Sequence, residues 1–522
     1  MMPHLQRYVP ALVTTAALGL LVYLLYPYYG GCLDADSIAY LTIARRYAAG
    51  DVATAINGYW SPWSCWLVAL LLKSGLQPIP SAIIIDTLAA AGIVALSQSF
   101  FLRFSLGRVV QWLMGAALTL FLCYAVYLQW FADLWMCFFL LALLRITVSE
   151  RFAAWPGYWI AGGIAGGLAY YAKAYALPFV VLQTAAFAWM ARRDADRSGR
   201  IKGLLTIAGL TLVMAFGWVL ALHQKYDTWT IGTAGSLNTS WVLNGKQYWK
   251  DEYRYLVPPA HPGSPYLWED PYLVGKVMPY QGTAAGFARS QAMRVVYNLS
   301  KMGTDLGALS PFLMLAILFG LALVLSARIR SHFPARLELL SASMLLLPLG
   351  YTVVVSEERY LWYMVPLSMV PLALLLAKAM RQTEPRVYKA ALYLLALCYV
   401  CHPVMKLKEM YRNGLEDRQI ADALQRAGLK GGFTGNPQPG AEKERVIRLS
   451  YYMDDFHYYH PINAPSHEQL MAEMSLRKVK YYLHFAREAD GAGYQPRNSK
   501  GHPLPEVPLD IKTNFRIFYD ID

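Results

Sequence analysis

Two carboxylates, Asp34 and Asp36, lie just after the first long apolar segment of the sequence. Charged side chains at the edge of a membrane span are costly, so they usually have a partner, water or a chemical task. Asp36 opens a predicted helix over 36–49 that ends at Gly50, and a helix N-terminus favours an ionised carboxylate. Such a carboxylate could accept a proton from a hydroxyl group, although Asp-Ser before a helix is also typical of an ordinary N-cap.

The same pair of carboxylates offers a second chemistry. Hard divalent cations such as Mg²⁺ or Mn²⁺ bind carboxylate oxygens together with phosphate oxygens, so Asp34 and Asp36 could hold one between them. An Asp-x-Asp pair is short, and the sequence does not require a cofactor.

Composition places these residues in a membrane protein with many spans. The 522 residues are 56% hydrophobic and 16% charged, whereas soluble domains carry about 25% charged residues. The net charge of +13 falls largely in short loops between apolar segments, as the positive-inside rule requires, and no nucleic-acid-binding motif accompanies it. Cys32 and Cys65 share the first long loop and could form a disulfide, whereas Cys398 and Cys401 lie in an apolar helix and are expected to pack.

Eleven apolar segments are read as membrane spans. They are 9–28, 80–102, 109–128, 131–148, 156–172, 174–191, 203–223, 306–327, 337–355, 360–378 and 387–402. The short loops rich in Lys and Arg then fall on the cytoplasmic side. The long loops 29–79 and 224–305 and the tail from 403 face outward. The first span lacks a cleavage pattern and is expected to be a retained anchor in the cell (inner) membrane, with the N-terminus in the cytoplasm.

Two short interfacial helices are expected in the first outer loop. Helix 36–49 should lie at the membrane surface with Ile38 and Leu41 toward lipid. The second helix begins at Ser61-Pro62, an N-cap followed by a first-turn proline, and it is too short to cross a membrane.

The second outer loop, 224–305, is rich in Trp, Tyr, Pro and Gly, and includes Trp241, Tyr266 and Trp268. It could be an aromatic belt at the membrane interface. It could equally cover a sugar or a lipid, because aromatic faces pack on the apolar faces of pyranose rings.

Small residues are concentrated at 162–167, with the sequence Gly-Gly-Ile-Ala-Gly-Gly. A glycine-rich phosphate loop would lie between a strand and a helix, but this segment lies inside a predicted span. Small residues four apart instead favour the close approach of two membrane helices.

The tail, 403–522, predicts a small α/β domain outside the membrane, following a transmembrane module over 1–402. A polar helix is expected over 415–427. A second helix is expected over 466–476, with Ser466 as N-cap and Gln469 completing a capping box. Strands are expected at 432–435, 446–453, 479–485 and 515–521.

Several short motifs, in their order along the chain, resemble the GT-C superfamily of membrane glycosyltransferases. The likeness is to the bacterial branch related to the protein O-mannosyltransferases and the lipid A aminoarabinose transferase. It covers the whole chain. The motifs are Asp36-Ser37-Ile38-Ala39-Tyr40, then Ala44 through Gly50-Asp51, Trp60-Ser61-Pro62-Trp63, Gly167-Leu168-Ala169 with Lys173, and Glu358-Arg359-Tyr360-Leu361 with Pro366. The sequence departs from the family where many members have Asp-Glu, here Asp36-Ser37, and where many have Lys-Pro-Pro or a Glu before the second loop helix.

The resemblance implies an α-helical GT-C fold and a polyprenyl-phosphate-sugar donor, with sugar transfer and inversion on the outer face. Asp36 would act as general base on the acceptor hydroxyl, with Asp34 as a second carboxylate. Cations must stabilise the leaving phosphate. The candidates are Arg359, whose planar fork suits phosphate, and then Lys173. Arg359 could instead pair only with Glu357 or Glu358, and Lys173 could reach the interface. Further expected contacts to substrate are Tyr40, Trp60 and Glu358.

Three other functions remain open. A transporter or flippase of lipid-linked sugars would show paired repeats and ionisable groups near the midplane, and here the notable charges lie at the outer surface. A ligase that transfers a whole glycan would use much the same architecture. A scaffold would bind a partner through the tail. The sequence does not identify the sugar or the acceptor, which could be a lipid, a glycan or a protein of the cell envelope.

Overall fold

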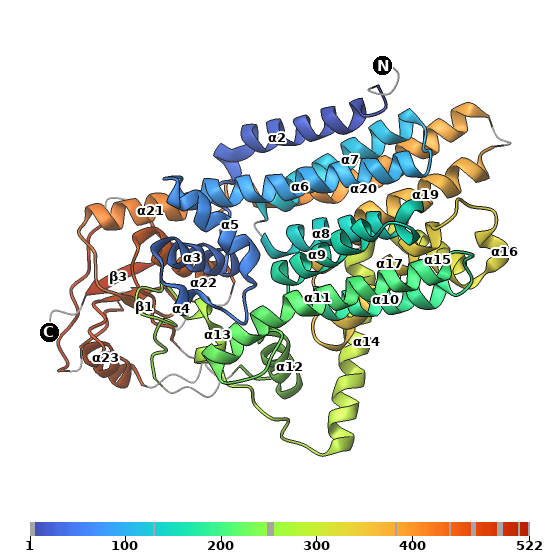
Figure 1. Ribbon diagram of the computed structural model, residues 1–522. Coiled ribbons are helices and arrows are strands. Elements are labelled where there is room, and N and C mark those ends of the chain that lie inside the picture. The colour runs from blue at the N-terminus through green and yellow to red at the C-terminus, as the bar shows by residue number, and fades with distance from the viewer. Residues whose placement is uncertain are drawn as a thin grey trace.

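The computed structural model describes residues 6–128, 131–247, 255–381, 384–437, 440–460, 466–487, 494–498, 500–509 and 512–519. Long helices run side by side across the molecule, and a small sheet lies at one end together with the helices of the tail (Figure 1). The overall architecture is therefore a helical membrane module joined to a small α/β unit, as the sequence predicts.

Helices occupy every segment that was predicted to span the membrane. They are α2 (Val9–Tyr29), α6 (Pro78–Arg103), α7 (Arg108–Tyr127), α8 (Phe131–Thr147), α9 (Pro156–Ala172), α10 (Ala176–Ala191), α11 (Arg197–Tyr226), α15 (Phe312–Leu325), α17 (Leu337–Leu346), α19 (Met364–Ala379) and α20 (Pro385–Met410). Within the described ranges, 5 helices are by themselves long and apolar enough to cross a membrane, and several apolar helices are shorter. The count of eleven spans thus stays a prediction.

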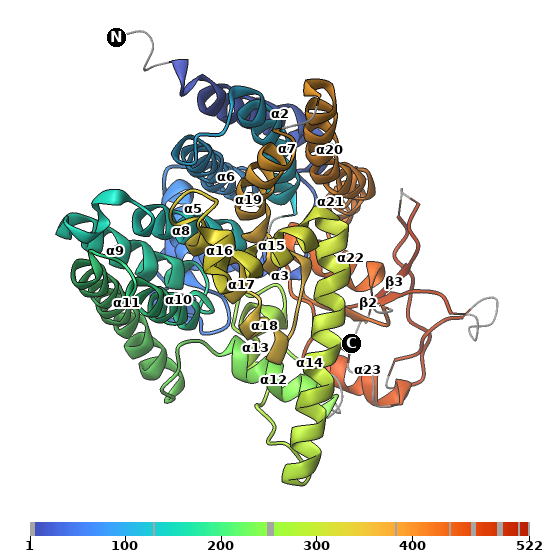
Figure 2. The same ribbon diagram turned by 90° about the vertical axis from the view of Figure 1, so that its right-hand side faces the viewer.

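Two predicted spans are interrupted at prolines. Helix α14 (Ala284–Leu309) meets α15 at an angle of 114°, and Ser310-Pro311 lies between them. Pro348 separates α17 from α18 (Leu349–Val353). Proline removes a helical hydrogen bond and disfavours the helical conformation of the residue before it. As a result α14 leaves the direction of the other helices and projects beyond them (Figures 1 and 2).

The glycine-rich segment brings α9 against α11, as predicted from its small residues. A Cβ atom on Gly163 would lie 2.5 Å from the Cβ of Leu210 on α11, and a Cβ on Gly162 would lie 2.7 Å from the side chain of Ile207. Both distances are shorter than real Cβ contacts, so the two helices can pack this closely only because side chains are missing here.

Gly163→Ala is expected to destabilise the chain by about 1–3 kcal/mol, since the new methyl group overpacks a contact with a Cβ that cannot move away alone. The measurement is the midpoint of thermal unfolding in detergent micelles. Gly209→Ala on α11 is the matched control, because its Cβ would have nothing within 4 Å. An equal midpoint for the two variants would contradict the close-packing interpretation.

The first outer loop forms three short helices, which are α3 (Ala35–Ala49), α4 (Val52–Ala55) and α5 (Pro62–Lys73). Gly50 ends α3 with a left-handed φ of 85°. Ile38 and Leu41 are buried inside the protein, so the prediction that they face lipid is wrong. Other parts of the chain cover α3, including η3 (Leu267–Glu269) of the second outer loop and the tail. Cys32 and Cys65 are both free.

The remaining elements of the membrane module are short. They are η1 (Glu150–Ala153), α12 (Ala234–Asn244), α13 (Pro271–Val274), α16 (Ala327–Arg330) and η4 (Glu358–Leu361). Of these, α12 and α13 belong to the second outer loop together with η3, and η4 precedes α19. These four elements lie in connections between long helices, at the same end of the helices as the first outer loop.

The tail contains α21 (Leu415–Arg426), β1 (Phe433–Gly435), α22 (Ala441–Met453), α23 (His467–Leu476), β2 (Tyr481–His484) and β3 (Arg516–Tyr519). Strand β2 is central, parallel to β1 and antiparallel to β3. The capping box of Ser466 and Gln469 is confirmed. The predicted strand at 446–453 is wrong, because these residues belong to helix α22. Nearly all of them are buried, and a short, fully buried run carries no periodicity that separates a strand from a helix.

Helix α22 also fixes the start of the first outer loop. Its Arg448 donates from NH1 to the Leu33 carbonyl at 2.9 Å, and its Nε lies 2.5 Å from the Asp417 carboxylate. Nearby, the backbone N–H of Arg412 donates to the Tyr28 carbonyl at 3.1 Å. The tail thus holds the chain immediately before Asp34 and Asp36.

Candidate active site

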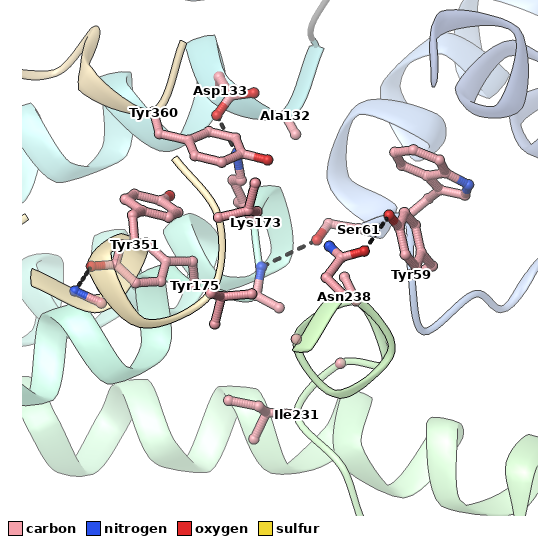
Figure 3. A pocket seen from close by; sticks show the side chains of 18 of the residues that line it. Tyr59, Ser61, Ala132, Asp133, Lys173, Tyr175, Ile231, Asn238, Tyr351 and Tyr360 are labelled. Atoms are coloured by element: carbon pink, nitrogen blue, oxygen red, sulfur yellow. Dashed lines mark hydrogen bonds and ion pairs between the residues drawn. The ribbon is translucent and has the colours of Figure 1, made fainter. Parts of the chain in front are cut away.

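A cavity of about 280 Å³ lies between the two outer loops and the ends of α8, α9 and α10. Figure 3 shows Asp133 and Lys173 on one side of it, with Tyr59 and Asn238 across from them. Its lining residues include Asp36, Tyr40, Tyr59, Trp60, Ser61, Asp133, Lys173, Tyr175, Ile231, Asn238, Tyr351, Arg359 and Tyr360. Aromatic rings thus make up much of the wall, and charged groups are few.

Asp36 lies in the first turn of α3, where Asp34 provides the N-cap. The Asp36 carboxylate therefore does not cap the helix and instead lines the cavity. Its Oδ1 accepts a hydrogen bond from Trp268 Nε1 at 3.0 Å, and its Oδ2 lies 3.3 Å from Arg359 NH2. Both carboxylate oxygens thus have a donor, and the side chain is 18% exposed, which keeps it reachable from the cavity.

Arg359 and Lys173, predicted from distant parts of the sequence, both line this cavity. Arg359 Nε lies 3.3 Å from Glu357 Oε2 and 3.9 Å from Asp133 Oδ2. The Lys173 ammonium forms an ion pair with Asp133 and lies 3.8 Å from the centre of the Tyr360 ring. The expected pairing of Arg359 with Glu357 exists, but it is only one of several contacts.

Asp34 has a different role from Asp36. Its Oδ1 accepts hydrogen bonds from the N–H and the hydroxyl of Ser37, at 2.8 and 2.6 Å, and it is not among the described residues that line the cavity. Burial and the neighbouring Asp36 carboxylate raise the pKa of Asp34. Because Asp34 caps α3 through Ser37 and does not line the cavity, it is poorly placed to accept a proton from a substrate there.

The two carboxylates are engaged by different groups, and a metal ion held between them stays a prediction. Asp34 Oδ1 faces Ser37, whereas the cation beside Asp36 is the Arg359 guanidinium. Over the described ranges, no group of three or more His, Cys, Asp or Glu side chains is arranged to hold a metal.

Known structures share this arrangement of helices. The Archaeoglobus fulgidus oligosaccharyltransferase, solved with zinc and sulfate, superposes with a TM-score of 0.51 at 13% identity over 90% of this chain and 67% of its own. ArnT from Cupriavidus metallidurans, in the apo state, gives 0.51 at 13% identity over 91% and 92%. The archaeal oligosaccharyltransferase AglB from Archaeoglobus fulgidus, with an inhibitory peptide and a dolichol-phosphate, gives 0.50 at 11% identity over 91% and 69%.

These proteins are members of the GT-C superfamily, and ArnT is its lipid A aminoarabinose transferase. The chain has a GT-C fold. No protein-family model and no curated protein matches the sequence itself. The resemblance of its motifs is thus confirmed at the level of the fold.

Within the GT-C fold, Glu358 lies apart from the cavity although it is the neighbour of Arg359. Its Oε1 is 3.0 Å from His402 Nε2 and accepts a hydrogen bond from the Tyr124 hydroxyl at 3.1 Å. The tight turn of η4 directs the two adjacent side chains to different partners. Glu358 therefore supports the fold of this region, while Arg359 reaches the cavity.

Tyr40 and Trp60 lie together in the wall of the cavity. Their ring centres are 5.2 Å apart, and Trp60 Nε1 donates to the Trp268 carbonyl at 2.9 Å. Tyr59 on the same loop donates its hydroxyl to Asn238 Oδ1 at 3.0 Å. Aromatic side chains of both outer loops thus form one surface that could cover a sugar or a lipid.

Asp133 and Trp268 are two of the site residues that were not predicted from the sequence. Asp133 is a single carboxylate at the start of an apolar helix, and an ionisable residue in a membrane helix is a signal of function in its own right. Trp268 had no such signal, because it is one of many aromatic residues in its loop.

Asp133→Asn is expected to destabilise the chain by about 3–5 kcal/mol, because it leaves the Lys173 charge without its partner in a mostly buried place. The Asp133 side chain is 2% exposed. The measurement is again the thermal midpoint in detergent, with Glu357→Gln as the exposed control. The double variant Asp133→Leu with Lys173→Met should recover much of the loss, and failure to do so would contradict the pairing.

Proposed function

We propose that this chain is a membrane glycosyltransferase that moves a sugar from a polyprenyl-phosphate carrier to a hydroxyl group of a cell-envelope acceptor. The observation that carries the proposal is the convergence of the Asp36 carboxylate and two cations, Arg359 and Lys173, on a single aromatic cavity, in which the second carboxylate, Asp133, is paired with Lys173. A base for the acceptor and cations for the departing phosphate are what this reaction needs. The GT-C fold supports the same conclusion.

In the proposed reaction Asp36 accepts the proton of the acceptor hydroxyl. The acceptor oxygen forms a new bond to the anomeric carbon of the sugar. The bond between that carbon and the phosphate oxygen breaks, and its electron pair leaves with the polyprenyl phosphate. A single displacement of this kind inverts the anomeric configuration.

The ion pairs of the cavity allow Arg359 to exchange a protein carboxylate for the phosphate of the donor. Arg359 contacts Asp36, Asp133 and Glu357, so its guanidinium is well compensated without a ligand. A phosphate that draws Arg359 toward itself would leave Asp36 Oδ2 ready to accept a proton. The polyprenyl tail would lie among the apolar helices, and the dolichol-phosphate in the AglB structure supports a lipid phosphate as ligand.

The proposed orientation follows the distribution of Lys and Arg in the short loops. The cavity and the tail then face the periplasmic or extracytoplasmic side of a multi-pass inner-membrane protein, with the N-terminus in the cytoplasm. The proposed partners are a polyprenyl-phosphate sugar, an envelope lipid, glycan or protein, and the bilayer, and no nucleic acid.

The proposal is tested in cells that lack this gene. Envelope glycans and lipids are compared by mass spectrometry before and after rescue with the wild-type gene. The expected result is the loss of one sugar mass, restored on rescue, together with binding of undecaprenyl phosphate to the purified chain. If the deletion instead causes lipid-linked sugars to accumulate on the cytoplasmic face, the chain is a flippase and the proposal fails. Loss of a whole oligosaccharide mass, and not of one sugar, would make it a ligase.

A further inference from the structure

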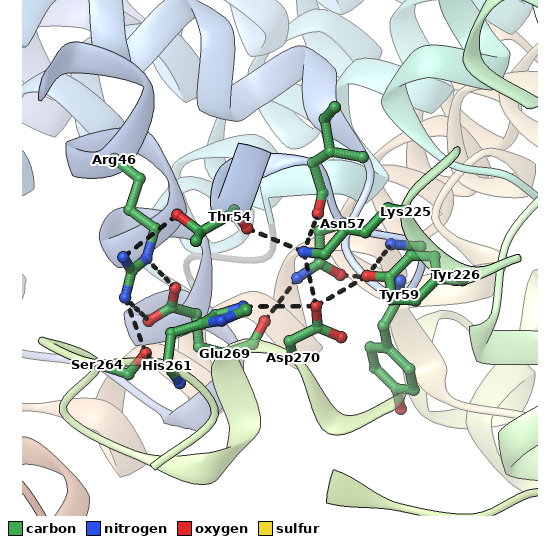
Figure 4. Close-up of polar contacts among 12 residues, drawn as sticks. Arg46, Thr54, Asn57, Tyr59, Lys225, Tyr226, His261, Ser264, Glu269 and Asp270 are labelled. Atoms are coloured by element: carbon green, nitrogen blue, oxygen red, sulfur yellow. Dashed lines mark hydrogen bonds and ion pairs between the residues drawn. The ribbon is translucent and has the colours of Figure 1, made fainter. Parts of the chain in front are cut away.

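Trp268 is followed by two buried carboxylates, Glu269 and Asp270, which are 3% and 0% exposed. Figure 4 shows that each faces its own group of partners, Arg46 on one side and Lys225 with Tyr226 on the other. Burying two adjacent charges is costly unless each is paired and hydrogen-bonded. The two ion pairs therefore hold the segment that follows Trp268 in one position.

The Glu269 side chain forms an ion pair with Arg46 of α3. From the same guanidinium, NH2 donates to Ser264 Oγ at 3.0 Å and to the Pro262 carbonyl at 3.1 Å. In addition Asn57 Nδ2 donates to the Glu269 carbonyl at 2.7 Å. The second outer loop is thus fastened to the last turn of α3 and to the segment after α4.

The Asp270 side chain is held by the end of α11. Its Oδ2 lies 3.0 Å from Lys225 Nζ, 2.8 Å from the Tyr226 hydroxyl and 3.7 Å from His261 Nε2. Lys225 also donates to the Thr54 carbonyl at 3.0 Å. One ammonium group thus joins the long helix α11, the first outer loop and the second outer loop.

Trp268 lies between these anchors and the cavity. Its indole N–H reaches Asp36 Oδ1, its carbonyl accepts from Trp60, and its ring stacks on Trp241 at 5.9 Å between ring centres. With Oδ1 held by the indole, Oδ2 is the oxygen that faces Arg359. The two donors together define the plane of the carboxylate.

We propose that Trp268 is a positioning residue that orients the Asp36 carboxylate, and that the Glu269–Arg46 and Asp270–Lys225 pairs hold Trp268 in place. The inference rests on the proposed function, because it assigns to the second outer loop the task of aiming the base at the acceptor. Trp268 acts through Asp36 and not on the substrate itself. The aromatic loop is thereby a structural part of the active site and not only an interfacial belt.

The test compares Trp268→Phe, Glu269→Gln and the double variant. The rate is the initial appearance of the sugar mass that the deletion strain lacks. The second readout is the affinity of the purified chain for undecaprenyl phosphate. Trp268→Phe keeps an aromatic ring but removes the N–H donor, so the rate should fall about tenfold or more, with the affinity for undecaprenyl phosphate within about twofold of wild type. Trp229→Phe, at an exposed residue, is the matched control.

The double variant decides whether Glu269 acts through Trp268. If it does, the double variant should be about as slow as Trp268→Phe alone, because effects on one pathway do not add. Arg46→Lys, which keeps the charge, should retain more activity than Glu269→Gln. Thermal midpoints in detergent show whether each variant still folds.

Three outcomes overturn the inference. Wild-type rates for Trp268→Phe, while Asp36→Asn is inactive, would reject the positioning role and leave the proposed function standing. Additive losses in the double variant would reject the link to Glu269. If Trp268→Phe loses affinity for undecaprenyl phosphate as much as it loses rate, Trp268 only supports the shape of the cavity and does not position Asp36. By contrast, an active Asp36→Asn variant would reject the proposed function itself.

Discussion

Asp36→Asn is expected to slow sugar transfer by about 10²–10⁴-fold, the usual contribution of a general base. The amide keeps the size of the side chain and can still accept from Trp268, but it cannot take up the proton of the acceptor hydroxyl. The measurement is the initial rate at which the deletion strain regains its missing sugar mass. Membrane insertion of the variant is verified by blotting, and its affinity for undecaprenyl phosphate should not fall.

Asp34→Asn is the variant that separates the two neighbouring carboxylates. Asp34 is the N-cap of α3, and Asn is about as good an N-cap as Asp. The structural role therefore predicts little change in thermal midpoint or in rate. If Asp34→Asn loses as much rate as Asp36→Asn, Asp34 shares the chemistry, as the sequence alone suggested. If Asp36→Asn is fully active, the assignment of Asp36 as the general base is rejected.

The parts of the fold that depend on local sequence were predictable. Long apolar segments became helices, Gly50 ended α3, and Ser466 with Gln469 formed the capping box. These features are decided by residues within a turn or two of one another. The breaks at Pro311 and Pro348 follow equally local rules, but the high mean hydropathy of both segments favoured one continuous span in each.

The candidate site was only partly predictable, because its contacts join residues far apart in the chain. Arg359 and Asp36 are 323 positions apart, and they were linked by family resemblance and not by any pattern in the sequence. Asp133 and Trp268 were not predicted because the contacts that identify them, with Lys173 and Asp36, join distant parts of the chain. Ile38 and Leu41 looked suited to lipid, but no local rule shows that another part of the chain will cover them.

Arg359→Gln is expected to lower the rate of transfer by about 10²–10³-fold, as when one donor to a developing anion is removed. The proposed donor, a polyprenyl-phosphate sugar, is a phosphodiester with one negative charge, and the polyprenyl phosphate that leaves is a monoester that gains a second. The contact of Arg359 with the phosphate therefore strengthens as the bond breaks, which is the condition for a residue to speed the reaction and not merely to bind. The initial rate and the affinities for donor and undecaprenyl phosphate are the measurements.

Two further variants test whether the effect is specific to the Arg359 guanidinium. Arg359→Lys keeps the charge but loses the planar fork, so it should recover only part of the rate. Glu358→Gln changes the adjacent residue, whose carboxylate faces His402 and Tyr124, and it should retain transfer. If Arg359→Gln weakens donor binding but leaves the rate at saturating donor unchanged, Arg359 binds the ground state only. The charge that develops on the leaving phosphate would then fall to Lys173, whose own pairing with Asp133 would have to open during the reaction.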